Sequence, residues 1–225
     1  IYRLAMLRKA RIIVISSAVR DYLVRWLNIP AEKITIIHNG IEVSKFRQGL
    51  PDNKEKDVIA RSAATWQSDF KKELGIKDGE FIIGSVSRLD PVKGHRYLLH
   101  ALPLVLKEIP SLKLLIVGDG PERHGLENMV SELGLKEKVI FTGYREDIPE
   151  ILSILDVFVQ PSLKEGFGVS ILEAIAAGKP VVATNVDGIS ELAGEGNGII
   201  LVPPGDTGHL VFQVIRLFKD ESLRQ

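Results

Sequence analysis

Cysteine is absent from the 225-residue sequence, so the chain can form neither a disulfide framework nor a thiolate metal site. The Asn-x-Ser/Thr sequon for N-glycosylation is absent as well, and both absences fit the reducing cytosol. No apolar run approaches the ~20 residues that span a bilayer, and the start of the chain has no signal-peptide pattern. These absences predict a soluble cytoplasmic protein.

An excess of charge of one sign is also missing, because Lys plus Arg and Asp plus Glu number 29 each. No long-range field therefore draws the chain to nucleic acid, and any anion must be bound locally. The five histidines have no ligand-like spacing, and no Asp-x-Asp pair occurs. We expect no nucleic-acid partner, no cofactor and no metal, and we expect His95 and His100 to decorate a helix.

Short apolar segments alternate with helical segments over most of the chain. The expected strands span residues 81–86, 112–117, 138–141, 157–160, 181–184 and 199–202, and the expected helices span about 94–108, 121–133, 148–155, 170–177, 189–192 and 207–219. Strands that are apolar on both faces and alternate with helices form a parallel sheet covered on both sides. We therefore predict an α/β fold, Rossmann-like and three-layered, around a mostly parallel six-stranded sheet.

The first part of the chain is predicted to belong to a different unit. Residues 1–9 look like the middle of a basic amphipathic helix. They are followed by a strand at 11–15, a helix from Ser16 or Ser17 to about Asn28, and a strand at 34–38. We expect residues 1–45 to be the tail of a truncated N-terminal domain with its linker. Residues 46–225 are expected to form the second domain. The basic start is expected to pack between domains, with peripheral contact to an anionic membrane as the alternative.

Five loops that follow strands carry residues of unusual chemistry, and in parallel sheets such loops share the edge where ligands bind. Arg88 and Lys93 lie five residues apart ahead of a helix and could neutralise two phosphate groups. A solvated turn is the alternative. A cation at a helix N-terminus is unfavourable unless an anion joins it, which favours the phosphate site.

The segment from Lys164 to Glu173 places two carboxylates eight residues apart around a glycine-bounded turn that opens onto a helix. Backbone amides at the positive end of a helix suit phosphate and polyhydroxyl groups. Glu165 could accept hydrogen bonds from sugar hydroxyls or simply be solvated. Glu173, in an otherwise apolar helix, needs either a ligand such as a ribose diol or a salt bridge to a neighbouring lysine. Together with the basic loop, this segment predicts a nucleotide-sugar site.

Another glycine turn, Gly118-Asp119-Gly120-Pro121, is expected to lead into a helix with Pro121 at its first position, which is a packing device. Gly125 comes too late for the G-x-G-x-x-G fingerprint of dinucleotide binding, so the main sequence evidence for a dehydrogenase is absent. No P-loop and no Ser/His/Asp set can be assembled either.

Four motifs occur in a fixed order along the chain. They are Ser-Arg-Leu-Asp-Pro-Val-Lys-Gly at 87–94, Val-Gly-Asp-Gly-Pro at 117–121, Glu-Gly-Phe-Gly at 165–168 with Glu173, and Gly-Lys-Pro-Val-Val-Ala-Thr at 178–184. The ordered set resembles the C-terminal domain of retaining family 4 glycosyltransferases of the GT-B fold (glycosyl transferases group 1), over about residues 39–209. The resemblance implies a donor site for a UDP-, GDP- or ADP-sugar.

The resemblance also implies roles for individual residues. The catalytic residues would be Arg88 and Lys93, which hold the diphosphate, and Glu165, which contacts the transferred sugar. The donor-binding residues would be Glu173 on the ribose hydroxyls, the backbone of Gly166, Phe167, Gly168 and Val169 on sugar and phosphate, Gly118, and Tyr144 and Arg145 beside the base.

In the complete enzyme, the resemblance implies metal-independent hexosyl transfer with retention at the anomeric carbon, to an unknown sugar, lipid or polysaccharide acceptor. Positive charge would stabilise the departing diphosphate, and Glu165 would orient the sugar without acting as a covalent nucleophile. Because most of the acceptor domain would be missing, we expect this chain to bind the donor without turning it over.

The chain departs from the family in one motif, where Asp187-Gly188-Ile189-Ser190-Glu191 stands in place of the frequent Gly-Gly-Ile-Pro-Glu. We therefore assign no ligand contacts to residues 187–191. A nucleotide-sugar epimerase of the same fold and a non-catalytic nucleotide-sugar binding module stay open as alternatives to transfer.

Overall fold

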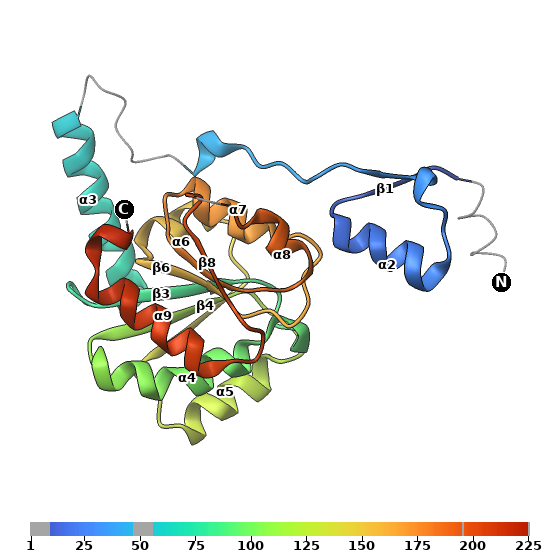
Figure 1. The fold of residues 1–225 in the computed structure, drawn as a ribbon. Coiled ribbons are helices and arrows are strands. Elements are labelled where there is room, and N and C mark those ends of the chain that lie inside the picture. Colours follow the sequence, from blue (N-terminus) through green and yellow to red (C-terminus); the bar gives the residue numbers. More distant parts are fainter. Residues whose placement is uncertain (1–9, 47–55, 195, 225) are drawn as a thin grey trace.

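The computed structural model describes residues 10–46, 56–194 and 196–224 (Figure 1). The expectations for the basic start at residues 1–9 lie outside these described residues. The same holds for the first residues of the polar segment that leads into the second domain.

The N-terminal segment forms a small unit of its own. Its strands β1 (Ile12–Val14) and β2 (Ile34–Ile36) pair in parallel, and α2 (Ser17–Leu27) lies between them in the chain. The Ser16 side chain caps α2 by accepting a hydrogen bond from the Val19 amide, as the sequence predicts. Both strands are shorter than predicted; the short turn η1 (Ala31–Lys33) precedes β2, and η2 (Val43–Lys45) follows it (Figure 1).

Six strands form the sheet of the main domain, and every neighbouring pair is parallel. They are β3 (Phe81–Val86), β4 (Leu112–Val117), β5 (Val139–Gly143), β6 (Val157–Gln160), β7 (Val181–Thr184) and β8 (Ile199–Val202), in the order β5-β4-β3-β6-β7-β8. The predicted α/β fold with a parallel six-stranded sheet is confirmed. The order reverses between β3 and β6, and in open parallel sheets ligands bind outside the carboxyl ends of the strands at such a switch point.

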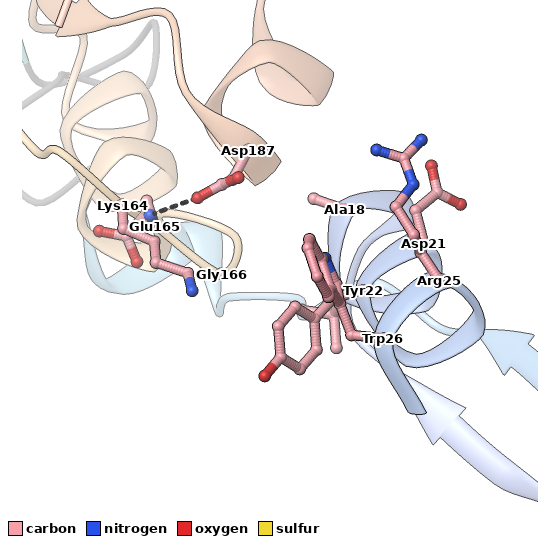
Figure 2. A pocket seen from close by; sticks show the side chains of 10 residues that line it. Ala18, Asp21, Tyr22, Arg25, Trp26, Lys164, Glu165, Gly166 and Asp187 are labelled. Atoms are coloured by element: carbon pink, nitrogen blue, oxygen red, sulfur yellow. Dashed lines mark hydrogen bonds between the residues drawn. The ribbon is translucent and has the colours of Figure 1, made fainter. Parts of the chain in front are cut away.

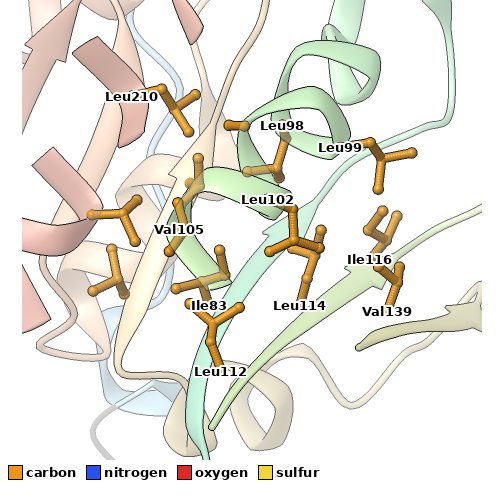
Figure 3. Packing of buried hydrophobic residues seen from close by; sticks show 14 of the residues in the cluster. Ile83, Leu98, Leu99, Leu102, Val105, Leu112, Leu114, Ile116, Val139 and Leu210 are labelled. Atoms are coloured by element: carbon orange, nitrogen blue, oxygen red, sulfur yellow. The ribbon is translucent and has the colours of Figure 1, made fainter. Parts of the chain in front are cut away.

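Helices cover both faces of the sheet and complete the three layers (Figure 1). One face carries α4 (His95–Glu108), α5 (Arg123–Glu132) and α9 (Thr207–Lys219), and the other carries α3 (Lys56–Glu73), α6 (Ile148–Ile154), α7 (Val169–Ala176) and α8 (Asp187–Leu192). Figure 3 shows the first layer, where Leu98 and Leu102 of α4 pack onto Leu114 of β4. Two more short turns are η3 (Pro91–Lys93) and η4 (Glu221–Arg224). In the described part of the chain, no helix is both long and apolar enough to cross a membrane.

The prediction that Pro121 opens a helix is wrong, because α5 begins at Arg123. The turn before α5 is held instead by Leu89 in the loop after β3. The Leu89 amide donates to the Asp119 carbonyl oxygen (2.9 Å), and the Leu89 carbonyl oxygen accepts from the Glu122 amide (2.9 Å). These bonds fix residues 119–122 in a turn and delay the helix by two residues.

Two glycines with nearly the same positive φ angle allow a test of this packing. Gly94 (φ 70°) lies where a Cβ would be 2.0 Å from the Pro161 carbonyl oxygen, whereas Gly134 (φ 68°) has no such neighbour within 4 Å. We expect Gly134→Ala to cost about 1 kcal/mol for its left-handed backbone. Gly94→Ala should cost about 3 kcal/mol or more, because it also forces two loops apart. Urea unfolding of both variants measures the difference, and equal losses would contradict the close approach.

Candidate functional site

Backbone contacts join the loops that follow β3 and β6 at the switch point. The Val92 carbonyl oxygen accepts hydrogen bonds from the amides of Leu163 (2.7 Å) and Lys164 (3.3 Å). Gly94 has no side chain and so lets its backbone approach the carbonyl group of Pro161. The residues next to these contacts, Lys93 and Glu165, are therefore brought together although 72 positions separate them.

Lys93 and Glu165 form the ion pair at the centre of the site. Lys93 Nζ lies 2.6 Å from Glu165 Oε2, and the two side chains are only 20% and 12% exposed. Ser162 Oγ donates to the same carboxylate oxygen (3.4 Å) and accepts in turn from Gln160 Nε2 (2.8 Å). Within the described residues, Glu165 Oε1 has no hydrogen-bond partner, so one oxygen of this oriented carboxylate is left for a ligand.

A cavity of about 310 Å³ opens beside this ion pair. This volume is at the small end of the range for ligand pockets. The cavity brings together seven of the predicted site residues, namely Arg88, Lys93, Glu165, Gly166, Phe167, Gly168 and Val169. Sequence reasoning missed the other lining residues, Ile15, Asn39, Val86, Ser87 and Ser170.

Positive charge converges on the cavity from two sources. Gly168 (φ 89°) caps α7, and the next two residues, Val169 and Ser170, both line the cavity. Amides in the first turn of a helix have no intrahelical partners and carry the positive end of the helix dipole. The cationic side chains of Arg88 and Lys93 are the second source. The Arg88 side chain is 70% exposed, with its Nε 3.1 Å from Asp90 Oδ2, so it can turn toward an anion at little cost.

The N-terminal segment also reaches the site. The His38 ring stacks on Phe167, with ring centroids 5.2 Å apart, and His38 Nδ1 lies 3.1 Å from the Ile15 carbonyl oxygen. Phe167 is only 4% exposed, so the stack holds the glycine-bounded turn in place. No sequence pattern pointed to the stack, because it joins residues more than a hundred positions apart.

Glu173 lies on α7 outside the residues that line the cavity. Its half-buried carboxylate has no hydrogen bond or ion pair with any residue that the structure describes, so the predicted salt-bridge alternative is not found there. Burial raises the pKa of Glu173, as expected of a carboxyl group that has lost water without gaining a partner. Its assignment to ribose hydroxyls stays a prediction.

The remaining predicted site residues lie at the carboxyl ends of β4 and β5. The Gly118 amide donates to the Gly143 carbonyl oxygen (2.8 Å), and a Cβ at Gly118 would lie 2.0 Å from the Ser87 carbonyl oxygen. Gly118 is thus a point of close packing next to the cavity. Tyr144 is 75% exposed.

Arg145 is occupied by neighbours within the protein. Its Nε donates to Asp147 Oδ1 (2.7 Å), and its guanidinium lies 3.9 Å from Glu73 and over the ring of Phe70. These contacts turn Arg145 toward α3. A place for Tyr144 and Arg145 beside a base therefore stays a prediction.

The expectation that His95 decorates a helix surface is wrong, whereas His100 is exposed on α4. His95 is the first residue of α4 and is 2% exposed, because the turn at Gly94 carries it under the loop after β3. Its Nε2 lies 3.1 Å from Ser87 Oγ. Burial, reinforced by the nearby Lys93, lowers the pKa of His95 to about 4, so the ring is neutral and fixes Ser87 at the wall of the cavity.

The described residues contain no cluster of three or more His, Asp or Glu side chains that could hold a metal ion. The charged groups that face the cavity are Arg88, Lys93 and Glu165. The site is therefore a cationic pocket with one oriented carboxylate, which can bind an anion and accept hydrogen bonds from a polyhydroxyl group at once.

The sequence profile of the family described as glycosyl transferases group 1 matches residues 67–225, and that of glycosyltransferase family 4 matches residues 1–45. The chain belongs to the glycosyl transferases group 1 family. The sequence-based recognition of the family and of its GT-B fold is thereby confirmed.

Two curated relatives illustrate the match. The chain is 31% identical to glycosyltransferase MJ1607 of Methanocaldococcus jannaschii, over 99% of this chain and 54% of that protein. It is 30% identical to the UDP-Gal:alpha-D-GlcNAc-diphosphoundecaprenol alpha-1,3-galactosyltransferase of Escherichia coli, over 95% of this chain and 52% of that protein. The chain thus spans about half the length of these relatives.

Among solved structures, Anabaena Alr3699/HepE in complex with UDP and glucose is similar with a TM-score of 0.83 and 27% identity, over 98% of this chain and 57% of that one. The crystal structure of the glycosyltransferase WaaG, at 21% identity, has a TM-score of 0.77 and shares the fold.

The buried His95 predicts a pH dependence of stability. Its pKa of about 4 in the folded chain lies below the ordinary 6.5, so between these values the unfolded chain binds a proton that the folded chain does not. Stability from this group is complete above about pH 6.5 and is lost as the pH falls toward 4, by about 2 to 3 kcal/mol in all. Urea unfolding at pH 7 and pH 4.5 should show this loss in the wild type and in the exposed control His100→Gln. The loss should be smaller in His95→Gln, and an unchanged loss there would contradict the assignment.

Proposed function

We propose that this chain is the donor-binding part of an enzyme that transfers a hexosyl group from a nucleotide diphosphate sugar to an acceptor, with retention of anomeric configuration and without a metal ion. The observation that carries the proposal is the single cavity that Arg88, Lys93, Glu165 and the start of α7 share. On this proposal the 225-residue chain binds the donor without turning it over, and transfer is a property of the longer protein.

The cations of the cavity act on the leaving group. As the bond between the anomeric carbon and the diphosphate oxygen breaks, its electron pair stays on the diphosphate, where negative charge grows. Arg88, Lys93 and the first amides of α7 stabilise that charge. Lys93 and the amides are in place before the reaction begins, whereas the exposed Arg88 side chain turns toward the anion. A hydroxyl of the sugar, lipid or polysaccharide acceptor then supplies the oxygen of the new bond to the anomeric carbon, and its proton passes to the departing diphosphate.

Lys93 has a double role in this proposal. An ammonium group has three donors, of which one serves Glu165 at 2.6 Å and two remain for phosphate oxygens. Glu165 in turn keeps Oε1 for a sugar hydroxyl, and its negative charge favours a positive anomeric centre. The ion pair thus places the leaving group and the sugar side by side.

Two relatives support a uridine nucleotide as the donor. Anabaena Alr3699/HepE was crystallised with UDP and with UDP-glucose, and the similar enzyme of Escherichia coli is named for UDP-Gal. The acceptor named for that enzyme is a lipid-linked sugar diphosphate. We propose a UDP-hexose as donor and a sugar or lipid-linked sugar as acceptor.

Calorimetric titration of the chain with UDP, GDP and ADP and their glucose conjugates, without added metal, tests the donor site. Saturable binding of one nucleotide family at a single site supports the proposal. If the folded chain binds none of them at millimolar concentration, the donor-site proposal fails for this chain.

Removing either cation should weaken nucleotide binding. We expect Lys93→Met and Arg88→Ala each to raise the Kd for UDP by about tenfold or more, because a charge-assisted contact with phosphate is lost. Lys136→Ala, which removes an exposed lysine far from the cavity, is the matched control and should bind UDP like the wild type. Calorimetry gives the Kd, and equal binding by Lys93→Met and the control would contradict the assignment.

Removing the carboxylate should have the opposite effect on the nucleotide. Glu165→Gln takes a negative charge from the anion site and releases Lys93, so we expect UDP to bind as well as before or up to about tenfold more tightly. UDP-glucose should lose its advantage over UDP, because the oriented acceptor for its hydroxyls is altered. A parallel loss of both ligands would show that Glu165 serves the fold and not the sugar.

A further inference from the structure

Helix α8 holds the backbone that carries Glu165. The Asp187 carboxylate accepts a hydrogen bond from the Glu165 amide (3.2 Å), as Figure 2 shows, and the Gly188 amide donates to the Glu165 carbonyl oxygen (3.2 Å). A Cβ at Gly188 would lie 2.3 Å from the Gly166 carbonyl oxygen. The first turn of α8 therefore touches residues 165 and 166 so closely that neither part can shift alone.

The other end of α8 reaches the N-terminal segment. Glu191 Oε2 accepts a hydrogen bond from the Ser17 amide (3.0 Å), and Glu191 Oε1 accepts one from the Ala18 amide (2.9 Å). The next amide, that of Val19, is bound by Ser16 Oγ (3.2 Å). Three successive amides at the start of α2 are thus satisfied, and two of them by a residue more than 170 positions away.

The charge of Glu191 matches its position. An ionised carboxylate at a helix N-terminus interacts favourably with unpaired amides and with the helix dipole. Burial by itself raises the pKa of Glu191, but the bonds from the Ser17 and Ala18 amides outweigh it and bring the pKa below its usual value. The group is therefore ionised at neutral pH.

Few other contacts fix α2 relative to the donor loop. Figure 2 shows the two parts facing each other across a pocket of about 650 Å³, with Tyr22 and Trp26 on one side and Lys164 to Gly166 on the other. Lys164 Nζ lies 5.3 Å from the centre of the Tyr22 ring, and Trp26 is 69% exposed. Because the pocket separates most of α2 from the loop, the hydrogen bonds that the structure describes between α2 and the main domain are those to Glu191 of α8.

We propose that Glu191 is a positioning residue, which holds the first turn of α2 against α8 and thereby sets the position of the Glu165 loop in the donor site. The proposal rests on the proposed function of that site. It gives a role to the Asp-Gly-Ile-Ser-Glu segment at 187–191, to which the sequence assigned no ligand contact. Glu191 touches no part of the cavity, so its effect on the donor passes through Asp187, Gly188 and Glu165.

The test compares the wild-type chain with Glu191→Gln and with Glu132→Gln, which removes an exposed glutamate on α5. Backbone amide resonances and amide exchange of Ser17, Ala18, Glu165 and Gly166 report on the two ends of the connection. Calorimetry with UDP and with UDP-glucose reports on the site. We expect all four amides to respond in Glu191→Gln, the UDP-glucose Kd to rise about two- to tenfold, and the UDP Kd to change by less than about twofold.

A simple helix cap would give a different pattern. If only Ser17 and Ala18 respond and the preference for UDP-glucose over UDP is unchanged, the proposal is overturned. If the wild-type chain binds neither ligand, the proposed function fails while the amide comparison still decides whether α2 and the Glu165 loop are coupled. Should Glu191→Gln not fold, Glu191→Asp keeps the charge, cannot reach both amides, and is expected to give about half of each effect.

Discussion

The site depends on one close approach, that of the loop after β3 to the loop after β6. The two strands are neighbours at the point where the strand order reverses, so their loops leave the sheet side by side. The Val92 carbonyl oxygen and the missing side chain of Gly94 then bring the two backbones into contact. The central ion pair of the cavity depends on this approach, because Lys93 and Glu165 could not lie 2.6 Å apart if the loops diverged.

A carboxylate inside an anion site needs an explanation, because alone it would repel a diphosphate. The pairing of Glu165 with Lys93 supplies one: the ammonium group screens the carboxylate and still has donors for phosphate. Ser162, which is held by Gln160, donates to the same carboxylate oxygen, so the carboxylate is oriented from the buried side. In the proposed reaction, the same pair therefore serves opposite charges on the two sides of the bond that breaks, which a cation or an acid alone could not do.

The fold could be predicted almost entirely from the sequence, because strands buried on both faces are visible as short apolar runs. All six predicted strands of the main sheet are found within one or two residues. The conformations of the loops were harder to predict. Pro121 and His95 were placed wrongly because the loop after β3, through Leu89 and Ser87, decides their surroundings.

The candidate site, too, could be predicted only in part, because some of its contacts join distant parts of the chain. Glycine and charged residues in the loops pointed to Arg88, Lys93 and the turn at 165–169, all of which line the cavity. Asn39 and the stack of His38 on Phe167 could not be found, because they depend on how the N-terminal segment docks. Docking is set by exposed and individually weak contacts, which leave no periodic pattern in a sequence.

The weak contacts between the N-terminal segment and the main domain matter for the site. Buried packing holds the sheet and its loops rigidly, whereas the N-terminal segment meets the main domain through an exposed carboxylate on two amides, one ring stack and one cation over a ring. Contacts of this kind are individually small compared with the buried packing inside the main domain. Yet the cavity takes Ile15 and Asn39 from one part and Lys93 and Glu165 from the other. The cavity is therefore complete only when the two parts meet, so on the proposed function the weak contacts between them decide how readily a donor is enclosed.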